Sequence, residues 1–125
     1  MTNDILTLSI ADLGAAYRKR ELSPVDVTET CLAVISQTEP ALHAWVEVSA
    51  ENARQSARMS EVELRGGSDL GPLHGVPVGI KDIFDVAGFP TRCGSPARAD
   101  QREATSDAAS VASLRAGGAV ILGKT

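Results

Sequence analysis

The chain has 125 residues and a formal net charge of −4, with 12 lysines and arginines against 16 acidic residues. This acidic balance argues against a surface that coats nucleic acid. The hydrophobic fraction of 43% is sufficient for a core, and a chain of this length buries one core rather than two. We therefore expect at most one domain and no direct nucleic-acid partner.

The start of the chain and its cysteines bear on location and metal binding. No apolar run approaches the roughly 20 residues that cross a bilayer, and Met1–Thr7 lacks the basic cluster of a secretory signal. We expect a cytoplasmic protein with no membrane partner. Cys31 and Cys93 lie in different predicted elements, and His43 and His74 are the two histidines, so no structural zinc site is expected.

Three helices are predicted in the first half of the chain. A capping pattern and helical apolar spacing predict the first over Ser9–Arg20. The pair Ser23-Pro24 combines a cap with a proline in the first helical position, and it predicts a second helix that ends before Pro40. Ser49 can cap a third helix, Ala50–Arg65, whose narrow apolar side favours a surface position.

Two strands are predicted before the last third of the chain. Apolar and other residues alternate over Leu42–Val48, with Leu42 and Val46 on the face expected to be buried. The short apolar run Val76–Ile80 is a second strand, in which Pro77 must lie near the start or at a sheet edge. Segments 66–72 and 87–96 are rich in glycine or proline; the first is predicted to be a loop, and the second is predicted to be mostly loop with at most one short strand.

A helix followed by a strand is predicted at the end of the chain. Asp107 can cap a helix that carries Val111 and Leu114 on one side, Gly117-Gly118 end it, and Ala119–Leu122 is a buried strand. Helices and strands thus alternate along the chain. This order favours an α/β layer fold.

The segment from Gly118 to Thr125, GAVILGKT, matches the phosphate-loop pattern G-x-x-x-x-G-K-[ST]. A phosphate loop must follow a strand and open a helix, because its backbone N–H groups and the helix N-terminus hold the phosphates. Here the four middle residues are themselves the predicted strand. We therefore do not expect nucleotide binding.

Lys81 ends the glycine-interrupted apolar run Gly75–Asp82. Most lysines at strand ends point into water, so an ordinary surface role is one interpretation. The alternative is catalytic, because a lysine among apolar neighbours loses hydration and its neutral amine becomes a usable base. Gly75 and Gly79 would let backbone or substrate approach closely.

Three ordered blocks of the chain resemble the amidase signature family. They are GPLHGVPVGIKD at Gly71–Asp82, TRCGS at Thr91–Ser95 and DAASVASLRAGGAVILGKT at Asp107–Thr125. Family members usually begin with two helices, the second opening with a Ser-Pro pair like Ser23-Pro24. The resemblance implies the N-terminal part of the amidase signature fold, a mixed β-sheet layered with helices.

The resemblance also implies a reaction, the hydrolysis of linear carboxamides by a Ser-cisSer-Lys triad without metal or organic cofactor. Lys81 matches the catalytic lysine of the family. In that mechanism the neutral lysine draws a proton through a serine on a cis peptide bond and so activates a second serine as nucleophile. Both serines come after the equivalent of Thr125 in the family, and no serine of this chain is assigned either role.

The match predicts that residues 1–125 are the incomplete N-terminal part of a single amidase domain. Residues 1–65 are mostly helical, and residues 66–125 form an α/β part with the lysine motif. The chain alone is expected to be inactive; its partners would be a small-molecule amide and either the remainder of the amidase chain or a homo-oligomer. Ala119–Leu122 would lack its later neighbours and form an open apolar edge that promotes self-association.

Two alternatives remain at this point. One is the A-type subunit of an aminoacyl-tRNA amidotransferase, which shares these blocks and works on tRNA through partner subunits. The other is a non-catalytic truncated fragment that binds a partner. Several further residues are interpreted as structural: Cys31, Trp45, His74, Phe84 and Phe89.

Overall fold

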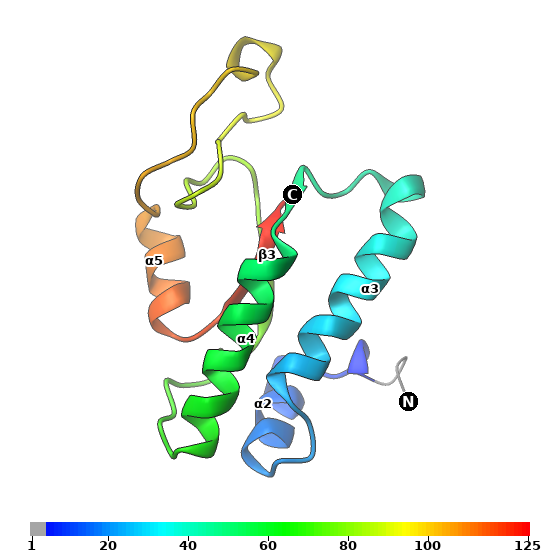
Figure 1. The fold of residues 1–125 in the computed structure, drawn as a ribbon, viewed down its shortest axis with the longest axis vertical. Coiled ribbons are helices and arrows are strands. Elements are labelled where there is room, and N and C mark those ends of the chain that lie inside the picture. The colour runs from blue at the N-terminus through cyan, green and yellow to red at the C-terminus, as the bar shows by residue number, and fades with distance from the viewer. Residues whose placement is uncertain (1–4) are drawn as a thin grey trace.

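The computed structural model describes residues 5–125, which form helices packed on a small mixed sheet (Figure 1). The elements in chain order are α2 (Ile10–Arg18), α3 (Pro24–Leu42), β1 (Glu47–Val48), α4 (Ala50–Arg65), β2 (Pro77–Ile80), the 3-10 turn η1 (Pro96–Arg98), α5 (Ala109–Ala116) and β3 (Val120–Lys124). The predicted α/β class is confirmed. Within residues 5–125, no helix combines the length and apolarity that crossing a membrane requires.

The sheet has the order β1-β3-β2, with β3 antiparallel to β1 and parallel to β2. Pro77 opens β2, and β2 is an edge strand of the described sheet, so both positions expected for this proline are met. The open edge predicted at Ala119–Leu122 is wrong, because β3 has a partner on each side. The segment of β1 folds back onto it, and the N–H of Ser49 donates to the carbonyl of Leu122 at 2.9 Å.

The core is divided between the two faces of β3. One cluster joins β3 to α3 and α4 and contains Leu32, Ala53, Ala57, Val120 and Leu122. A second joins the sheet to α5 and contains Ile80, Val86, Phe89, Val111 and Ile121. Because side chains alternate along a strand, Ile121 faces away from its neighbours Val120 and Leu122. Helices therefore cover both faces of the sheet, α3 and α4 on one and α5 on the other (Figure 1).

Helix α4 has the predicted bounds but not the predicted position. Ala53 and Ala57 are fully buried, because their small side chains let the helix lie directly against β3 and α3. The expectation that this helix lies at the surface is wrong for that face, while Met59 and Val62 on its other side are exposed. A side-chain cap from Ser49 is also absent.

The first two helices begin as predicted. The hydroxyl of Ser9 accepts a hydrogen bond from the N–H of Asp12 at 3.1 Å, and the hydroxyl of Ser23 accepts one from Val25 at 3.0 Å. A third buried cluster, Leu13, Tyr17, Val27 and Val76, packs α2 and α3 against the residues just before β2. The caps therefore fix where the two helices begin, and this cluster holds both helices at the amino end of that strand.

Helix α3 continues through Pro40 to Leu42, so its predicted end is wrong. His43 ends the helix in the left-handed conformation, and its N–H donates to the carbonyl of Glu39 at 2.9 Å. The Glu39 carboxylate then accepts the N–H groups of Ala44 and Trp45 at 3.1 Å each. Because the N–H groups of Ala44 and Trp45 bind this carboxylate at the end of the helix, they cannot pair with a neighbouring strand.

The predicted strand Leu42–Val48 is consequently reduced to Glu47–Val48. The face expected to be buried is also wrong, because Leu42 and Val46 are 67% and 52% exposed. Trp45, on the opposite side of the alternation, packs against the core instead. The period-two pattern here crosses a helix end and a turn rather than one strand.

Asp107 does not cap α5, whose N-cap is Ala108. Its carboxylate instead accepts the N–H of Ala87 at 2.8 Å and the Arg115 guanidinium at 2.6 Å. Burial opposes ionisation of Asp107, but these two partners hold its pKa below the usual range. The residue thus ties the loop after β2 to the last turn of α5.

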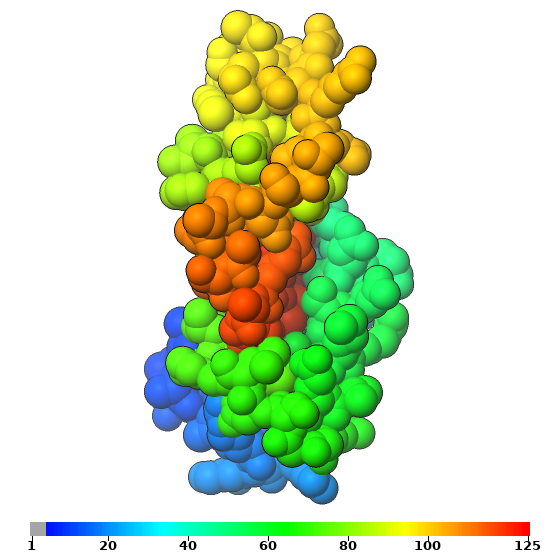
Figure 2. All heavy atoms as spheres, turned by 90° about the vertical axis from the view of Figure 1, so that its left-hand side faces the viewer, coloured from blue at the N-terminus to red at the C-terminus, as the bar shows by residue number. Residues whose placement is uncertain are grey.

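Between Phe89 and Ala104 the chain forms an arm that extends beyond the sheet, at the top of Figures 1 and 2. Isolated bridges between Ala87 and Ala104 and between Pro90 and Glu103 close its base. Apart from η1 and these bridges the arm is irregular, in agreement with the loop predicted over residues 87–96.

Candidate active site

Lys81 is the first residue after β2, and its side chain is exposed. The residues on either side of it are both bound to Thr125, which directly follows β3. The N–H of Thr125 donates to the carbonyl of Ile80 at 2.8 Å, and the N–H of Asp82 donates to the carbonyl of Thr125 at 2.8 Å. The backbone of Lys81 is therefore held on both sides.

The chain turns sharply at Lys81, whose carbonyl accepts the N–H groups of Ile83 at 2.7 Å and Phe84 at 3.1 Å. The Lys81 side chain makes no hydrogen bond or ion pair with any of residues 5–125. Ile83 and Phe84 are also 58% and 43% exposed. This part of the chain thus fixes the lysine backbone but supplies no burial for its ammonium group.

Trp45 packs against the strand two residues before Lys81. A Cβ atom at Gly79 would lie 2.9 Å from the indole ring and 3.2 Å from the methyl group of Thr125. Only glycine lets the ring lie this close to the strand. The close approach predicted at Gly79 is thus present, and the group that approaches is this tryptophan.

A buried ion pair lies directly beside the Lys81 turn. The ammonium of Lys124 is 2.8 Å from a carboxylate oxygen of Asp82, and their side chains are 1% and 5% exposed. The other carboxylate oxygen accepts the N–H of Arg92 at 3.2 Å, and the carbonyl of Asp82 accepts that of Cys93 at 3.0 Å. Burial opposes ionisation of Asp82, but Lys124 and the two N–H groups together lower its pKa.

The same network connects β3 to the base of the arm. The Lys124 ammonium also lies 3.4 Å from the carbonyl of Pro90 and 3.4 Å from the hydroxyl of Thr91. That hydroxyl donates to Asp85 at 2.7 Å. Lys124 belongs to a strand and its charge is neutralised internally, which agrees with the rejection of a phosphate loop at Gly118–Thr125.

The Asp82–Lys124 pair was not predicted from the sequence, although a signal for it exists. Each residue lies at the carboxyl end of a predicted apolar strand. Adjacent parallel strands bring such ends together, and the register pairs Ile80 with Lys124. The contact between Asp82 and Lys124 can therefore be inferred from the pairing of their two strands, but not from the sequence around either residue alone.

His74 has a structural role at the other end of β2. It is 1% exposed, and its Nδ1 accepts the N–H of Leu70 at 3.1 Å. The ring proton therefore belongs on Nε2, which lies 2.8 Å from the Glu63 carboxylate and donates to it. This geometry supports the structural interpretation of the residue.

The two cysteines lie in different surroundings, and neither belongs to a group of side chains that could hold a metal ion among residues 5–125. Cys31 is half-buried against two core clusters, and burial raises the pKa of its thiol, which disfavours the reactive thiolate. Cys93 is exposed in the arm. Across residues 5–125, no three His, Cys, Asp or Glu side chains are grouped so that they could hold a metal ion.

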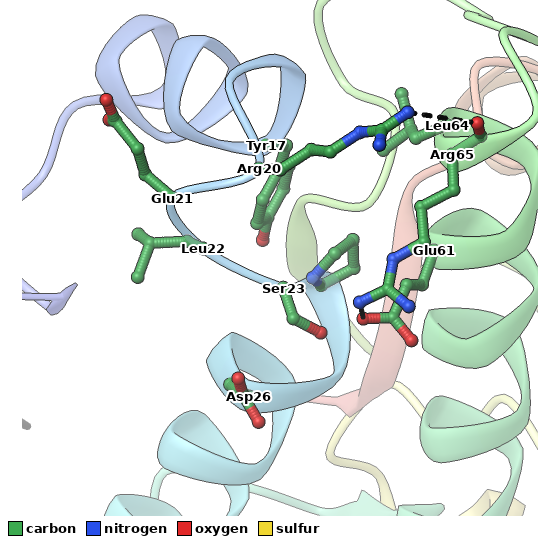
Figure 3. Close-up of a pocket in the computed structure, with 10 residues that line it drawn as sticks. Tyr17, Arg20, Glu21, Leu22, Ser23, Asp26, Glu61, Leu64 and Arg65 are labelled. Atoms are coloured by element: carbon green, nitrogen blue, oxygen red, sulfur yellow. Dashed lines mark hydrogen bonds and ion pairs between the residues drawn. The ribbon is translucent and has the colours of Figure 1, made fainter.

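A polar pocket of about 180 Å³ lies between the α2–α3 turn and the end of α4 (Figure 3). Tyr17 lines it and donates to the carbonyl of Gly75 at 3.1 Å, so the pocket lies at the amino end of β2. Arg20 donates to the carbonyl of Arg65 at 3.5 Å, and Arg65 pairs with Glu61 at 3.0 Å. The pocket is thus separate from Lys81, which follows the opposite end of the strand.

Comparison with known proteins gives consistent matches. A family model described as Amidase matches residues 26–125. An amidase from Pseudomonas putida is 41% identical over 123 residues, which are 98% of this chain and 26% of that protein. A glutamyl-tRNA(Gln) amidotransferase subunit from Acidothermus cellulolyticus is 39% identical over 123 residues, 98% of this chain and 24% of that protein. The chain thus spans about a quarter of the length of these relatives.

Solved structures share the fold. The peptide amidase from Stenotrophomonas maltophilia superposes with a TM-score of 0.87 at 36% identity, over 95% of this chain and 24% of that one. A bacterial aryl acylamidase superposes with a TM-score of 0.83 at 26% identity, over 94% and 25% of the two chains. The arrangement of α2 to β3 is therefore that of the corresponding quarter of these enzymes.

Proposed function

The chain belongs to the amidase signature family, and from this premise we propose that it forms part of a cytoplasmic enzyme that hydrolyses linear carboxamides through a Ser-cisSer-Lys triad. Lys81 is the lysine of that triad. The observation that carries the proposal is its position, an exposed side chain on a fixed turn at the carboxyl end of the parallel pair β2–β3. Open α/β sheets bind their ligands at this end of the strands.

In this proposal Lys81 works with two serines of the remaining part of the amidase domain. The neutral amine takes a proton through the first serine, and the second serine attacks the amide carbon. Backbone N–H groups stabilise the oxyanion, and Lys81 returns the proton to the departing ammonia or amine. Water then hydrolyses the acyl-enzyme, and the proposed mechanism uses neither a metal nor an organic cofactor.

The test is ammonia release from simple primary amides by the natural gene product that contains this chain. Lys81→Met should lower kcat by about 10²-fold to 10⁴-fold, the usual contribution of a general acid–base group. Lys19→Met is the matched control, because Lys19 is an exposed lysine at the end of α2. Unchanged turnover in folded Lys81→Met protein would overturn the proposal.

A second candidate is the A-type subunit of an aminoacyl-tRNA amidotransferase, since the amidotransferase protein from Acidothermus cellulolyticus is nearly as similar as the Pseudomonas putida amidase, at 39% against 41% identity. Both functions begin by releasing ammonia from an amide. They differ in the donor and in the fate of the ammonia. Strict preference for glutamine, with turnover that requires further subunits, would favour the amidotransferase; turnover of simple amides by one chain favours the amidase.

We also propose that the 125 residues alone are inactive and need the rest of the domain. Co-expression of residues 1–125 with the remaining part of the natural product should restore amide hydrolysis that neither part shows alone. Association of the two parts without activity would instead support a non-catalytic fragment that binds a partner.

A further inference from the structure

The Asp82–Lys124 pair differs from every other ion pair among residues 5–125. Both of its side chains are almost fully buried, at 1% and 5% exposure, whereas each other pair has at least one member that is 39% exposed or more. Two buried charges lose their hydration, and apolar side chains of similar size often stabilise a fold as well or better. Burial of the pair is therefore weak evidence that its role is to stabilise the fold.

The position of the pair suggests what it does. Asp82 directly follows Lys81, and its carboxylate joins that turn to β3 through Lys124 and to the arm through the N–H of Arg92. Lys124 in turn precedes Thr125, which binds the backbone on both sides of Lys81. Asp82 thus makes one of the backbone contacts that hold the lysine turn, and Lys124 is one residue away from Thr125, which takes part in both contacts.

We propose that Asp82 and Lys124 are positioning residues for Lys81, which hold its turn in place and keep the charge around it balanced. This inference rests on the proposed catalytic role of Lys81. It also gives a role to the lysine of the GKT segment, which matches the phosphate-loop pattern in its letters but not in its structural context. Lys124 neutralises Asp82 instead of binding a ligand.

The remaining charged groups around the turn are already engaged or lie apart from the pair. Asp85 accepts the hydroxyl of Thr91, and the Arg92 guanidinium donates to the carbonyl of Ala99 at 3.3 Å. Glu47 on β1, opposite Lys124 in register, is exposed. Removing one member of the buried pair therefore leaves one uncompensated charge beside Lys81.

The two single variants should change the reaction in opposite directions. Lys124→Met leaves the Asp82 carboxylate unpaired, and its negative charge favours the ammonium form of Lys81. Because the neutral amine is the active form, the acidic limb of the pH profile of kcat/KM moves to higher pH. Asp82→Asn leaves the Lys124 cation and moves that limb to lower pH. We expect shifts of at least about half a pH unit. In both variants kcat should fall about tenfold while KM stays within about twofold, because neither residue contacts substrate.

The double variant Asp82→Asn/Lys124→Met controls for misfolding of the single variants, because it leaves no unpaired charge in the interior. Its acidic limb should return to the wild-type position while its kcat stays low. The control is Glu29→Gln/Arg54→Met, which removes a more exposed pair between α3 and α4 and should leave the profile unchanged.

The outcomes separate this inference from the proposed function. If folded Lys81→Met is fully active, the triad assignment fails. If Lys81→Met is inactive but the single and double variants keep the wild-type profile and kcat, the assignment stands and the positioning role is wrong. A third outcome also contradicts the positioning role: the single variants yield less folded enzyme but keep the wild-type pH profile, and the double variant is fully active. The pair would then have only a structural role.

Discussion

The two ends of the parallel pair β2–β3 both contain buried polar groups, but they use them differently. At the amino end, the His74 ring joins the N–H of Leu70 to the Glu63 carboxylate, and Tyr17 donates to Gly75. At the carboxyl end, the buried charges of Asp82 and Lys124 neutralise each other. The amino end is covered by α2 and α3, with Glu63 of α4 bonded to His74, whereas the carboxyl end leaves Lys81 exposed.

The difference is that one cluster has all its polar side chains engaged, whereas the other surrounds a lysine that is not engaged within the described part of the chain. At the amino end, the polar side chains His74 and Tyr17 have partners within the chain, so the cluster has no group left for chemistry. At the carboxyl end, an equally well bonded network surrounds one lysine that has no partner among residues 5–125. A fixed turn that carries a free reactive group is what preorganised catalysis requires. Substitutions at the two ends should therefore affect different properties.

The largest effect on stability is expected from Gly118→Ala at the amino end. Gly118 has a φ of +77°, and a Cβ atom there would collide with the His74 ring. The left-handed conformation and the overpacking should together cost about 3 to 5 kcal/mol of unfolding free energy, measured by urea titration of the natural gene product.

Gly67→Ala is the matched control, because Gly67 has a similar φ of +85° but no atom within 4 Å of an added Cβ. It should cost only about 1 kcal/mol, the conformational part alone. Equal losses at the two glycines would mean that the His74 contact contributes nothing, and the amino end would not be the tightly packed region described.

His74→Asn should have the next largest effect on stability. It should not change turnover, which would show that the proposed active site does not extend to the amino end of β2. The shorter side chain cannot reach both Leu70 and Glu63, so we expect a loss of about 2 kcal/mol in unfolding free energy. The kcat of the folded protein should not change, since His74 lies at the end of β2 opposite Lys81. His43→Asn, at an exposed histidine with a left-handed backbone that asparagine tolerates, should be nearly neutral. A fall in kcat for folded His74→Asn would contradict the separation of the two ends.

Local signals in the sequence predicted much of the fold. The caps at Ser9 and Ser23 and both bounds of α4 are confirmed, because each depends on a few neighbouring residues. The errors arose where distant contacts or competing hydrogen bonds decide the outcome. Glu39 takes the N–H groups that the predicted strand would have used, and Asp107 binds Ala87 and Arg115 instead of capping α5.

The site was predictable only in part. The motif around Lys81 and its resemblance to a family identify the residue, but the sequence does not show that Asp82 and Lys124, 42 positions apart, form a buried pair. The prediction of an open edge at β3 failed for the same reason, since pairing with β1 is a long-range contact. Whether Lys81 is catalytic stays a prediction until its variants are measured.

Acid should weaken the carboxyl end specifically. The pKa of Asp82 is lowered in the folded protein, so the unfolded chain binds its proton more readily. The stabilisation is therefore present above the unfolded pKa of about 4 and is lost as the pH falls through the lower folded value. The difference in unfolding free energy between Asp82→Asn and wild type should therefore shrink as the pH falls from about 6 to strongly acidic values, measured by urea titration at each pH.

Asp107→Asn tests whether a second carboxylate contributes independently to the acid sensitivity. The pKa of Asp107 is also lowered, through Arg115 and the N–H of Ala87, so its variant should show a change of the same sign. The two residues lie in different networks, and their contributions should add. A pH-independent difference for Asp82→Asn would mean that the carboxylate is not held in its ionised form by Lys124.

The smallest effect is expected from Tyr17→Phe, which removes a single hydroxyl from the amino end. That hydroxyl donates to the carbonyl of Gly75 at 3.1 Å, and burial raises the pKa of the phenol, so it stays protonated as a donor. Its loss should cost about 1 kcal/mol of unfolding free energy, because the ring still packs with Leu13, Val27 and Val76. Turnover should be unchanged, since the bond lies before β2 and Lys81 lies after it. A variant that kept its stability but lost turnover would show that the two ends are coupled through the strand, and the division of roles between them would then be wrong.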